Sequence, residues 1–254
     1  MNIGIYQGRL TNSKVLQKFP KNWIKEFKYA KSIGYDHIEF FLEKKINPKN
    51  PIWIDKKKII KNIKTMKNKR AIICDNYLIF NSFLKDKNIN YIVEVIEHIS
   101  KLPKPKLIIP LKKSLLKKKS ILIANLNKVL KYAKKLKVEI SFECEFDYQN
   151  IVNLSKKIKR NFKITFDTGN VFLMEKNINN SFQKLRHLIN HIHIKDRNKL
   201  KKNTVFGLGL INFKSFFKLI KKLNYKNDLT LETNRGDDAI RTGQLNLTLL
   251  KKLI

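Results

Sequence analysis

Residues 126–145, LNKVLKYAKKLKVEISFECE, pass directly from one kind of regular structure to another. In the first part, apolar side chains recur every three or four residues from Leu126 to Leu136, which is typical of one face of an amphipathic helix. In the second part, the run VEISFECE (138–145) is short and largely apolar, and we expect a buried strand there. A helix followed closely by a strand is the repeating unit of a parallel α/β fold.

The same alternation continues in both directions along the chain. Helical faces are clearest at residues 23–33 and 213–223, and Gly34 is expected to end the first of these helices. No Pro/Gly/Ser-rich linker interrupts the pattern, and 254 residues is close to the roughly 250 of an eight-fold barrel. We therefore expect an α/β fold with a single (β/α)8 barrel domain spanning residues 1–254. The expected strands are residues 2–7, 37–41, 71–76, 106–111, 138–145, 163–168, 190–196 and 229–233.

The chain carries a strong positive charge, with 55 lysines and arginines against 20 acidic residues and a net charge of +35. Alone, this charge would indicate a nucleic acid or another anionic surface as partner. The lysines, however, are spread over every helix-like stretch, and the chain is also rich in Ile, Asn and Phe, whose codons are rich in A and T. We interpret the charge as a solvated surface that attracts anionic substrates, and we expect no specific nucleic-acid partner.

Other features narrow the class of protein. The N-terminus has no basic segment followed by a long apolar run, and no apolar run approaches about 18 residues, so we expect a cytoplasmic protein with no membrane partner. Cys74 and Cys144 lie in strand-like segments, where buried free thiols are expected, and we give them no chemical role. The sequence leaves the formation of a homo-oligomer open.

Metal-ligand chemistry stands at the ends of the last four expected strands. In barrels of this type the catalytic residues lie at the carboxyl ends of the strands. Any one of these carboxylates could simply pair with a lysine, but the joint occurrence on four successive strands predicts one divalent metal ion, Mn, Mg, Co or Zn. The four residues are Glu143, Asp167, His193 and Glu232.

Seven motifs are spread along nearly the whole chain: GIYQGRL (4–10), GYDHIEFF (34–41), FECE (142–145), FDTGN (166–170), HIHIKDR (191–197), TVFGLGLINF (204–213) and LTLET (229–233). Through these motifs the chain resembles the sugar phosphate isomerase/epimerase family, within the xylose isomerase-like barrel superfamily. The resemblance implies that Glu143, Asp167, His193 and Glu232 bind the metal. It also implies proton transfer next to a carbonyl through an enediolate, with Glu143 and Glu232 as the acid/base pair.

Two choices within this set depend on the resemblance. Alternation places His191 and His193 on the same face of their strand, and likewise Glu143 and Glu145, so the residues alone do not choose between them. The family pattern favours His193 and Glu143. His191 is then a core or supporting histidine, and Glu145 is a candidate substrate contact.

Further polar residues near strand ends could hold the hydroxyls or a phosphate of a substrate, although a structural salt bridge is an equally good interpretation for each. Gly207 and Gly209 could let the backbone approach a substrate oxygen or could simply form a turn. Asn170 stands where many sugar epimerases of the superfamily carry histidine, and an amide cannot act as an imidazolium, so no particular sugar is implied. The candidate substrate-binding residues are Gln7, Arg9, Glu39, Glu145, Asn170, Lys195, Arg197 and Arg235.

The expected function is therefore a metal-dependent isomerase or epimerase of a small sugar, free or phosphorylated. If both glutamates are only ligands, a metal-assisted hydride shift is the alternative mechanism. Dehydration of a cyclic polyol would use the same barrel and metal, whereas a non-catalytic sugar-binding barrel fits poorly with a complete ligand set. An apurinic-site endonuclease of the same superfamily needs several metals and more histidines than the five of this chain.

Overall fold

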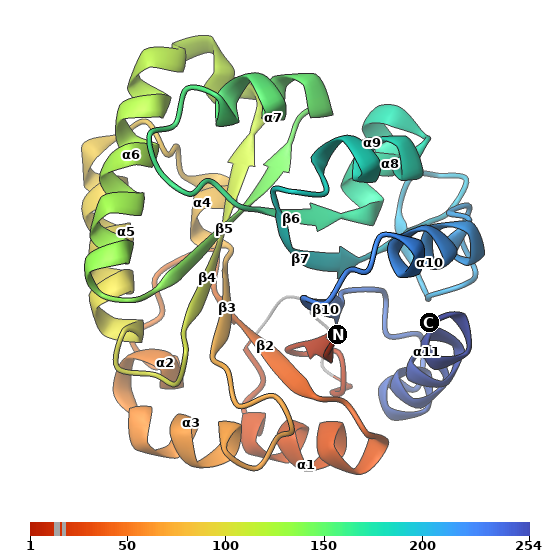
Figure 1. Ribbon diagram of the computed structural model, residues 1–254. Helices are drawn as coiled ribbons and strands as arrows, with labels where there is room; N and C mark the ends of the chain where they lie inside the picture. Colours follow the sequence, from red (N-terminus) through yellow and green to blue (C-terminus); the bar gives the residue numbers. More distant parts are fainter. Residues whose placement is uncertain (13–15, 17–18) are drawn as a thin grey trace. The chain divides into compact units, whose positions relative to one another are not determined.

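Strands and helices alternate along the chain in the computed structural model, which describes residues 1–12, 16 and 19–254 (Figure 1). The barrel strands follow the order β1-β10-β7-β6-β5-β4-β3-β2 of a closed barrel. This TIM-barrel topology confirms the predicted fold class, and all eight predicted strands are present to within two residues at either end. They are β1 (Ile3–Tyr6), β2 (His37–Leu42), β3 (Ile72–Asp75), β4 (Lys106–Lys112), β5 (Glu139–Glu145), β6 (Ile164–Asp167), β7 (Ile189–Ile194) and β10 (Asp228–Leu231).

The helices follow the predicted apolar faces. Gly34 ends the first helix with φ at 98°, a left-handed conformation that glycine adopts without a steric penalty, as predicted. A short antiparallel hairpin was not predicted; its strands, β8 (Asp196–Arg197) and β9 (Asn203–Thr204), have two residues each. The helices are α1 (Trp23–Ile33), α2 (Pro51–Ile54), α3 (Lys56–Ile63), α4 (Tyr77–Phe80), α5 (Asp86–Ile99), η1 (Lys113–Lys118), α6 (Lys119–Lys135), α7 (Tyr148–Ser155), α8 (Thr168–Glu175), α9 (Ile178–Leu185), α10 (Phe213–Lys222) and α11 (Ala239–Leu253).

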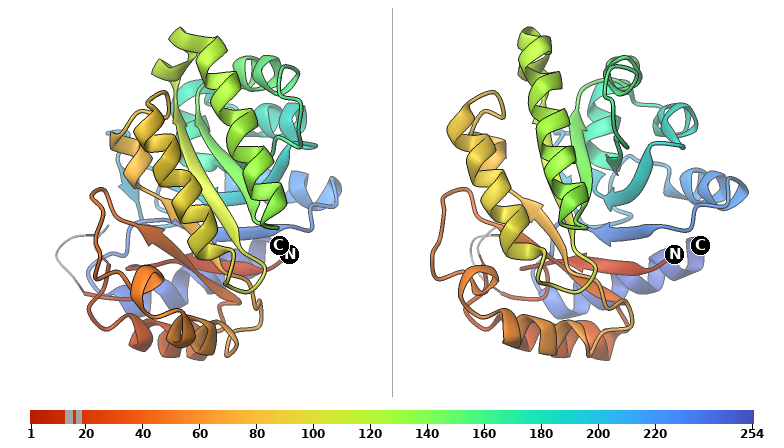
Figure 2. Two further views of the ribbon diagram at one scale, coloured as in Figure 1. Left: turned by 90° about the vertical axis from the view of Figure 1, so that its left-hand side faces the viewer. Right: turned by 60° about the vertical axis from the view of Figure 1, so that its left-hand side comes forward.

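Two compact units make up the chain, one of residues 1–39, 66–68 and 166–254 and the other of residues 40–65 and 69–165. In the first unit, β10 pairs with both β1 and β7 in parallel. In the second, β4 pairs with β3 and β5, and both views of Figure 2 show α5 and α6 lying alongside one another. A single domain over residues 1–254 stays a prediction.

Aromatic side chains form much of the core of the first unit. The rings of Phe166 on β6, Phe182 on α9 and Phe216 on α10 contact one another, with centroids 5.2 to 5.9 Å apart. Phe213 and Phe217, on the same face of α10, are also buried. The aromatic stripe that the sequence places on this helix is therefore core, as predicted, and it packs α10 against β6 and α9.

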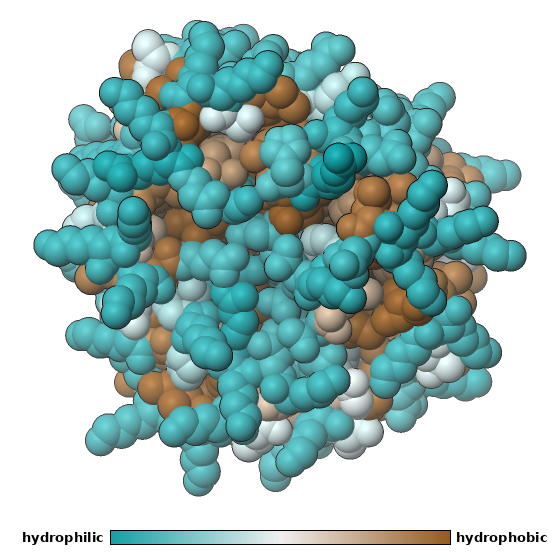
Figure 3. Space-filling view, in the orientation of Figure 1, coloured by the Kyte–Doolittle hydropathy of each residue, from teal (hydrophilic) through white to brown (hydrophobic). Residues whose placement is uncertain are grey.

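Polar and charged side chains dominate the face of the molecule that Figure 3 presents. Figure 3 shows hydrophilic residues spread over the face it presents, with smaller hydrophobic areas between them. None of the helices in the described part of the chain is long and apolar enough to cross a membrane. Cys74 and Cys144 are buried free thiols, as predicted.

Candidate active site

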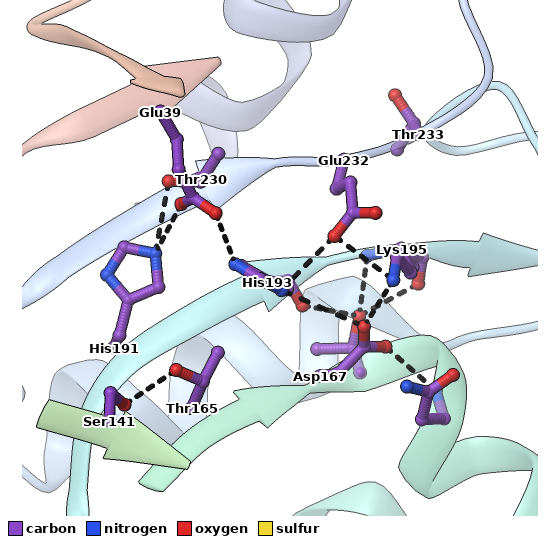
Figure 4. A network of polar contacts seen from close by, with 12 residues as sticks. Glu39, Ser141, Thr165, Asp167, His191, His193, Lys195, Thr230, Glu232 and Thr233 are labelled. Carbon is purple, nitrogen blue, oxygen red and sulfur yellow. Dashed lines mark hydrogen bonds and ion pairs between the residues drawn. The ribbon is translucent and has the colours of Figure 1, made fainter. Parts of the chain in front are cut away.

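Three of the predicted metal ligands converge at the strand ends of the first unit (Figure 4). Asp167 is the last residue of β6, His193 lies on β7, and Glu232 directly follows β10, where its N–H continues the ladder to Ile194 O. Nδ1 of His193 lies 3.1 Å from Oε2 of Glu232 and 4.0 Å from Oδ2 of Asp167. All three side chains are almost fully buried. The site therefore brings two carboxylate oxygens and one imidazole nitrogen together out of water.

Glu39 on β2 sets the orientation of the histidine. Its Oε1 accepts a hydrogen bond from Nε2 of His193 at 2.9 Å, and its Oε2 accepts one from Nε2 of His191 at 2.9 Å. Because a carboxylate only accepts, the hydrogen of each ring lies on Nε2, and His193 directs the lone pair of Nδ1 toward Asp167 and Glu232. Burial raises the pKa of Glu39, but its interaction with His193 and the hydrogen bonds from both imidazoles outweigh burial and hold that pKa well below its usual value.

The polar contacts continue from Glu39 into the barrel interior. The Thr230 hydroxyl lies 3.1 Å from Nε2 of His191 and 3.2 Å from Nε2 of His37. On the neighbouring strand β1, Gly4 leaves the space that the His37 ring occupies, since a Cβ at this position would collide with that ring. Buried polar groups need hydrogen-bond partners, and the Thr230 hydroxyl supplies one to each of the two inner histidines, His37 and His191.

Asp167 is fixed by the helix that follows it. Its Oδ1 accepts a hydrogen bond from the backbone N–H of Asn170 at 2.8 Å and so caps the N-terminus of α8. The side chain of Asn170 accepts a hydrogen bond of 3.0 Å from Arg197, whose guanidinium also donates to the backbone oxygens of Gly169 and Lys201. Asn170 and Arg197, both predicted substrate contacts, therefore bind one another beside the site.

Two buried cations face the carboxylates. Nζ of Lys195 lies 2.8 Å from Oδ2 of Asp167 and 3.0 Å from Oε2 of Glu232. Arg9 donates from Nε to Thr233 O at 2.8 Å, and its NH2 lies 3.8 Å from Oε1 of Glu232. The guanidinium also lies 5.0 Å from the centre of the Tyr6 ring. Burial lowers the pKa of Arg9, and the Glu232 carboxylate opposes that shift.

The remaining predicted residues lie on other elements or in the segments that follow them. Gln7, fully buried after β1, donates its backbone N–H to Glu39 O, and half-buried Arg235 donates to Gly8 O. Glu143, 6% exposed, and the more exposed Glu145 lie at the carboxyl end of β5 in the second unit. Glu39 was expected among the substrate contacts, but in the structure both of its carboxylate oxygens are engaged by imidazoles.

Sequence reasoning missed three residues that shape the site. Tyr6 places its ring edge-on to His193 at 6.2 Å, and Thr230 supports both inner histidines. Asp196 is fully buried, and its Oδ2 accepts hydrogen bonds from the N–H groups of Gly207 and Gly209 at 3.0 and 2.9 Å. These glycines therefore form a turn around a carboxylate of the protein itself. In the sequence, the position of these two glycines shortly after Asp196 was the feature that could have indicated the turn.

Buried groups of histidine and carboxylate side chains that could hold a metal ion are present among the described residues. A profile of the xylose isomerase-like TIM barrel family matches residues 27–252. This chain is a member of that family. No curated protein sequence matches it.

Several solved structures share this fold. D-Psicose 3-epimerase from Clostridium cellulolyticum H10, solved with D-tagatose, is 13% identical with a TM-score of 0.79, covering 100% of this chain and 99% of its own. 3-Keto-D-glucoside 4-epimerase from E. coli is 18% identical with a TM-score of 0.76, covering 99% of both chains. The probable 3-DHS dehydratase of Bacillus anthracis is 14% identical with a TM-score of 0.77, covering 99% of both chains. At these identities the likeness shows the fold.

Proposed function

We propose that this protein is a divalent-metal-dependent isomerase or epimerase of a small sugar, free or phosphorylated, that moves a proton at the carbon beside a carbonyl. The observation that carries the proposal is the convergence of Asp167 Oδ2, Glu232 Oε2 and His193 Nδ1 at the strand ends. Two of the similar structures are sugar epimerases, one of them solved with D-tagatose. The net charge of +35 would favour an anionic sugar phosphate.

The donor atoms suit Mn, Mg, Co or Zn. Two carboxylate oxygens with one imidazole nitrogen form a mixed set, and Glu39 holds the far nitrogen of His193 as carboxylates hold metal-bound histidines elsewhere. We assign the metal to Asp167, His193, Glu232 and Glu143, the last on its strand position and the family resemblance. When bound, the metal would act as a Lewis acid that polarises the substrate carbonyl.

The protein side chains would carry the proton. Glu232 is proposed to remove the proton from the substrate carbon or to return it. Its Oε1 faces Arg9, and its Oε2 faces His193. Glu143 is its proposed counterpart, through an enediolate. Substrate oxygens would be bound by residues near the strand ends, and Glu39 would also position the histidines. The proposed substrate contacts are Gln7, Arg9, Glu39, Glu145, Asn170, Lys195, Arg197 and Arg235.

Solvent deuterium tests the mechanism. Free and phosphorylated ketoses and aldoses are incubated with the metal-loaded protein in heavy water, and carbon-bound deuterium is measured by NMR. We expect deuterium at the carbon beside the carbonyl, with exchange abolished in Glu143→Gln and Glu232→Gln and unchanged in the exposed control Glu94→Gln. Turnover without deuterium would instead support a shielded proton transfer or a hydride shift, and full activity of either active-site variant would remove that glutamate from the mechanism.

Metal content tests the ligand assignment separately. We expect about one divalent ion per chain, strongly reduced in His193→Ala and Asp167→Asn but far less in His191→Ala, since His191 contacts Glu39 and Thr230 instead. Elemental analysis of the purified variants measures it. Equal metal content in all three variants, or about three metals in the parent, would contradict the assignment.

Dehydration of a polyol is the second candidate, favoured by the similarity to a probable dehydratase. It would use the same carboxylates to remove a proton next to a carbonyl, with a hydroxyl leaving from the adjacent carbon. Mass spectrometry of the products separates the two functions, because only dehydration yields a product lighter by one water.

A further inference from the structure

The ammonium group of Lys195 lies between two carboxylate oxygens of the candidate site. Its Nζ is 2.8 Å from Oδ2 of Asp167 and 3.0 Å from Oε2 of Glu232. Lys195 directly follows β7, and Figure 4 shows its side chain reaching these two carboxylates beside His193. The same two oxygen atoms face Nδ1 of His193. Lys195 therefore binds the atoms to which the proposed function assigns a metal ion.

The surroundings of Lys195 are built to hold it there. Its backbone N–H donates to Oγ1 of Thr168 at 2.9 Å, and that hydroxyl donates back to the Lys195 carbonyl at 2.8 Å. Gly169 lets the lysine stem pass close, since a Cβ there would lie 2.7 Å from the Cβ of Lys195. The side chain is only 11% exposed. A lysine seated in this way differs from the many solvated lysines of the surface.

An ammonium and a divalent ion cannot share these oxygens easily. Two cations bound to the same pair of buried carboxylates would repel one another at short range, in surroundings where water screens charge poorly. The four-carbon side chain of lysine, by contrast, is flexible, so rotation about its bonds can move the ammonium group to another position while the backbone stays in place. A metal ion bound at these oxygens would therefore compete with the Lys195 ion pairs.

We propose that Lys195 is a built-in counter-cation, which holds Asp167 and Glu232 in place before the metal binds and competes with the metal for them. The inference rests on the proposed function, because it takes these two carboxylates as metal ligands. In the metal-free protein the ammonium offsets the repulsion between two buried carboxylates. Metal binding then releases Lys195, which leaves a mobile positive charge beside the substrate.

Calorimetric titration with Mn²⁺ tests the competition. The parent is compared with Lys195→Met, which keeps the apolar stem and removes the charge. The matched control is Lys202→Met, at an exposed lysine in the turn that joins β8 to β9. We expect Lys195→Met to bind Mn²⁺ at least about tenfold more tightly and to melt at a lower temperature without metal, with Lys202→Met unchanged in both. Equal or weaker Mn²⁺ binding by Lys195→Met, while the parent binds Mn²⁺, would overturn this inference alone.

A second measurement uses the parent protein and does not depend on the folding of a variant. Lysines are acetylated briefly with and without Mn²⁺, and the modification of Lys195 is quantified by mass spectrometry relative to Lys202. We expect the reactivity of Lys195 to rise several-fold when Mn²⁺ is present, because the ammonium leaves its buried ion pairs. Unchanged or lower reactivity with bound Mn²⁺ would overturn the inference. If Mg²⁺, Co²⁺ or Zn²⁺ binds in place of Mn²⁺, that ion is used in both measurements, and binding of none of the four ions would overturn the inference together with the proposed function.

Discussion

Replacing Glu26 with glutamine is expected to stabilise the protein at alkaline pH relative to the parent. Glu26 lies on α1 and is 1% exposed, and its Oε1 accepts hydrogen bonds from the backbone N–H groups of Gly8 at 2.7 Å and Leu10 at 3.1 Å. These residues flank Arg9, which reaches the site. Burial raises the pKa of Glu26 from 4.5 to about 7, against the effect of both hydrogen bonds.

The magnitude follows from linkage between protonation and folding. Because the pKa of Glu26 is higher in the folded than in the unfolded protein, its contribution to stability is fully present below about pH 4.5 and is lost as the pH rises through about 7. The loss amounts to about 3 kcal/mol in the free energy of unfolding, of which about 2.5 kcal/mol falls between about pH 5 and about pH 8.5. Glutamine does not titrate, and its amide oxygen can still accept from both N–H groups.

Urea unfolding of the parent and Glu26→Gln across this pH range provides the assay. The free energy of unfolding of the variant minus that of the parent should rise by about 2.5 kcal/mol from the acidic to the alkaline end. The exposed Glu94→Gln serves as the control and should give a flat difference. A flat difference for Glu26→Gln, or one that falls with pH, would refute the reasoning.

Three further outcomes are expected. Gly4→Ala should lower the free energy of unfolding by at least about 1–3 kcal/mol in urea titrations, because the new Cβ would collide with the His37 ring. Thr230→Val keeps the shape but removes the hydroxyl next to His37 and His191, and the same assay should show a loss of about 1–3 kcal/mol. Binding to duplex DNA, followed by fluorescence anisotropy, should weaken steeply as salt rises and show no preference for abasic sites, whereas metal-dependent cleavage of an abasic duplex would contradict this.

The strands could be predicted because their signal is local. Barrel strands are buried on both faces, so each appears as a short apolar run, and the helices between them carry a separate periodicity. The polar interruptions at strand ends then indicated Asp167, His193 and Glu232, which the structure brings together. Strand position indicated this edge, because parallel strands end at the same edge of a sheet, and the family resemblance then favoured His193 over His191.

The supporting contacts could not be predicted, because they join distant parts of the chain or depend on one side-chain rotamer. Nothing near Glu39 in the sequence indicates that it binds His191 and His193, more than 150 residues away. Whether Lys195 turns toward a substrate or toward the carboxylates is likewise decided by packing around Thr168. The β8–β9 hairpin could not be predicted, because a strand of only two residues shows no alternating pattern in the sequence.

The two hydrogen bonds of Glu39 span 152 and 154 residues of sequence. During synthesis, β2 leaves the ribosome long before β7 exists, so the Glu39 carboxylate has not yet met its imidazoles. An unpaired buried charge is costly, and we therefore expect this carboxylate to stay in contact with water until β7 has been made. A protein that terminated before β7 would lack both imidazoles and the histidine that Glu39 orients.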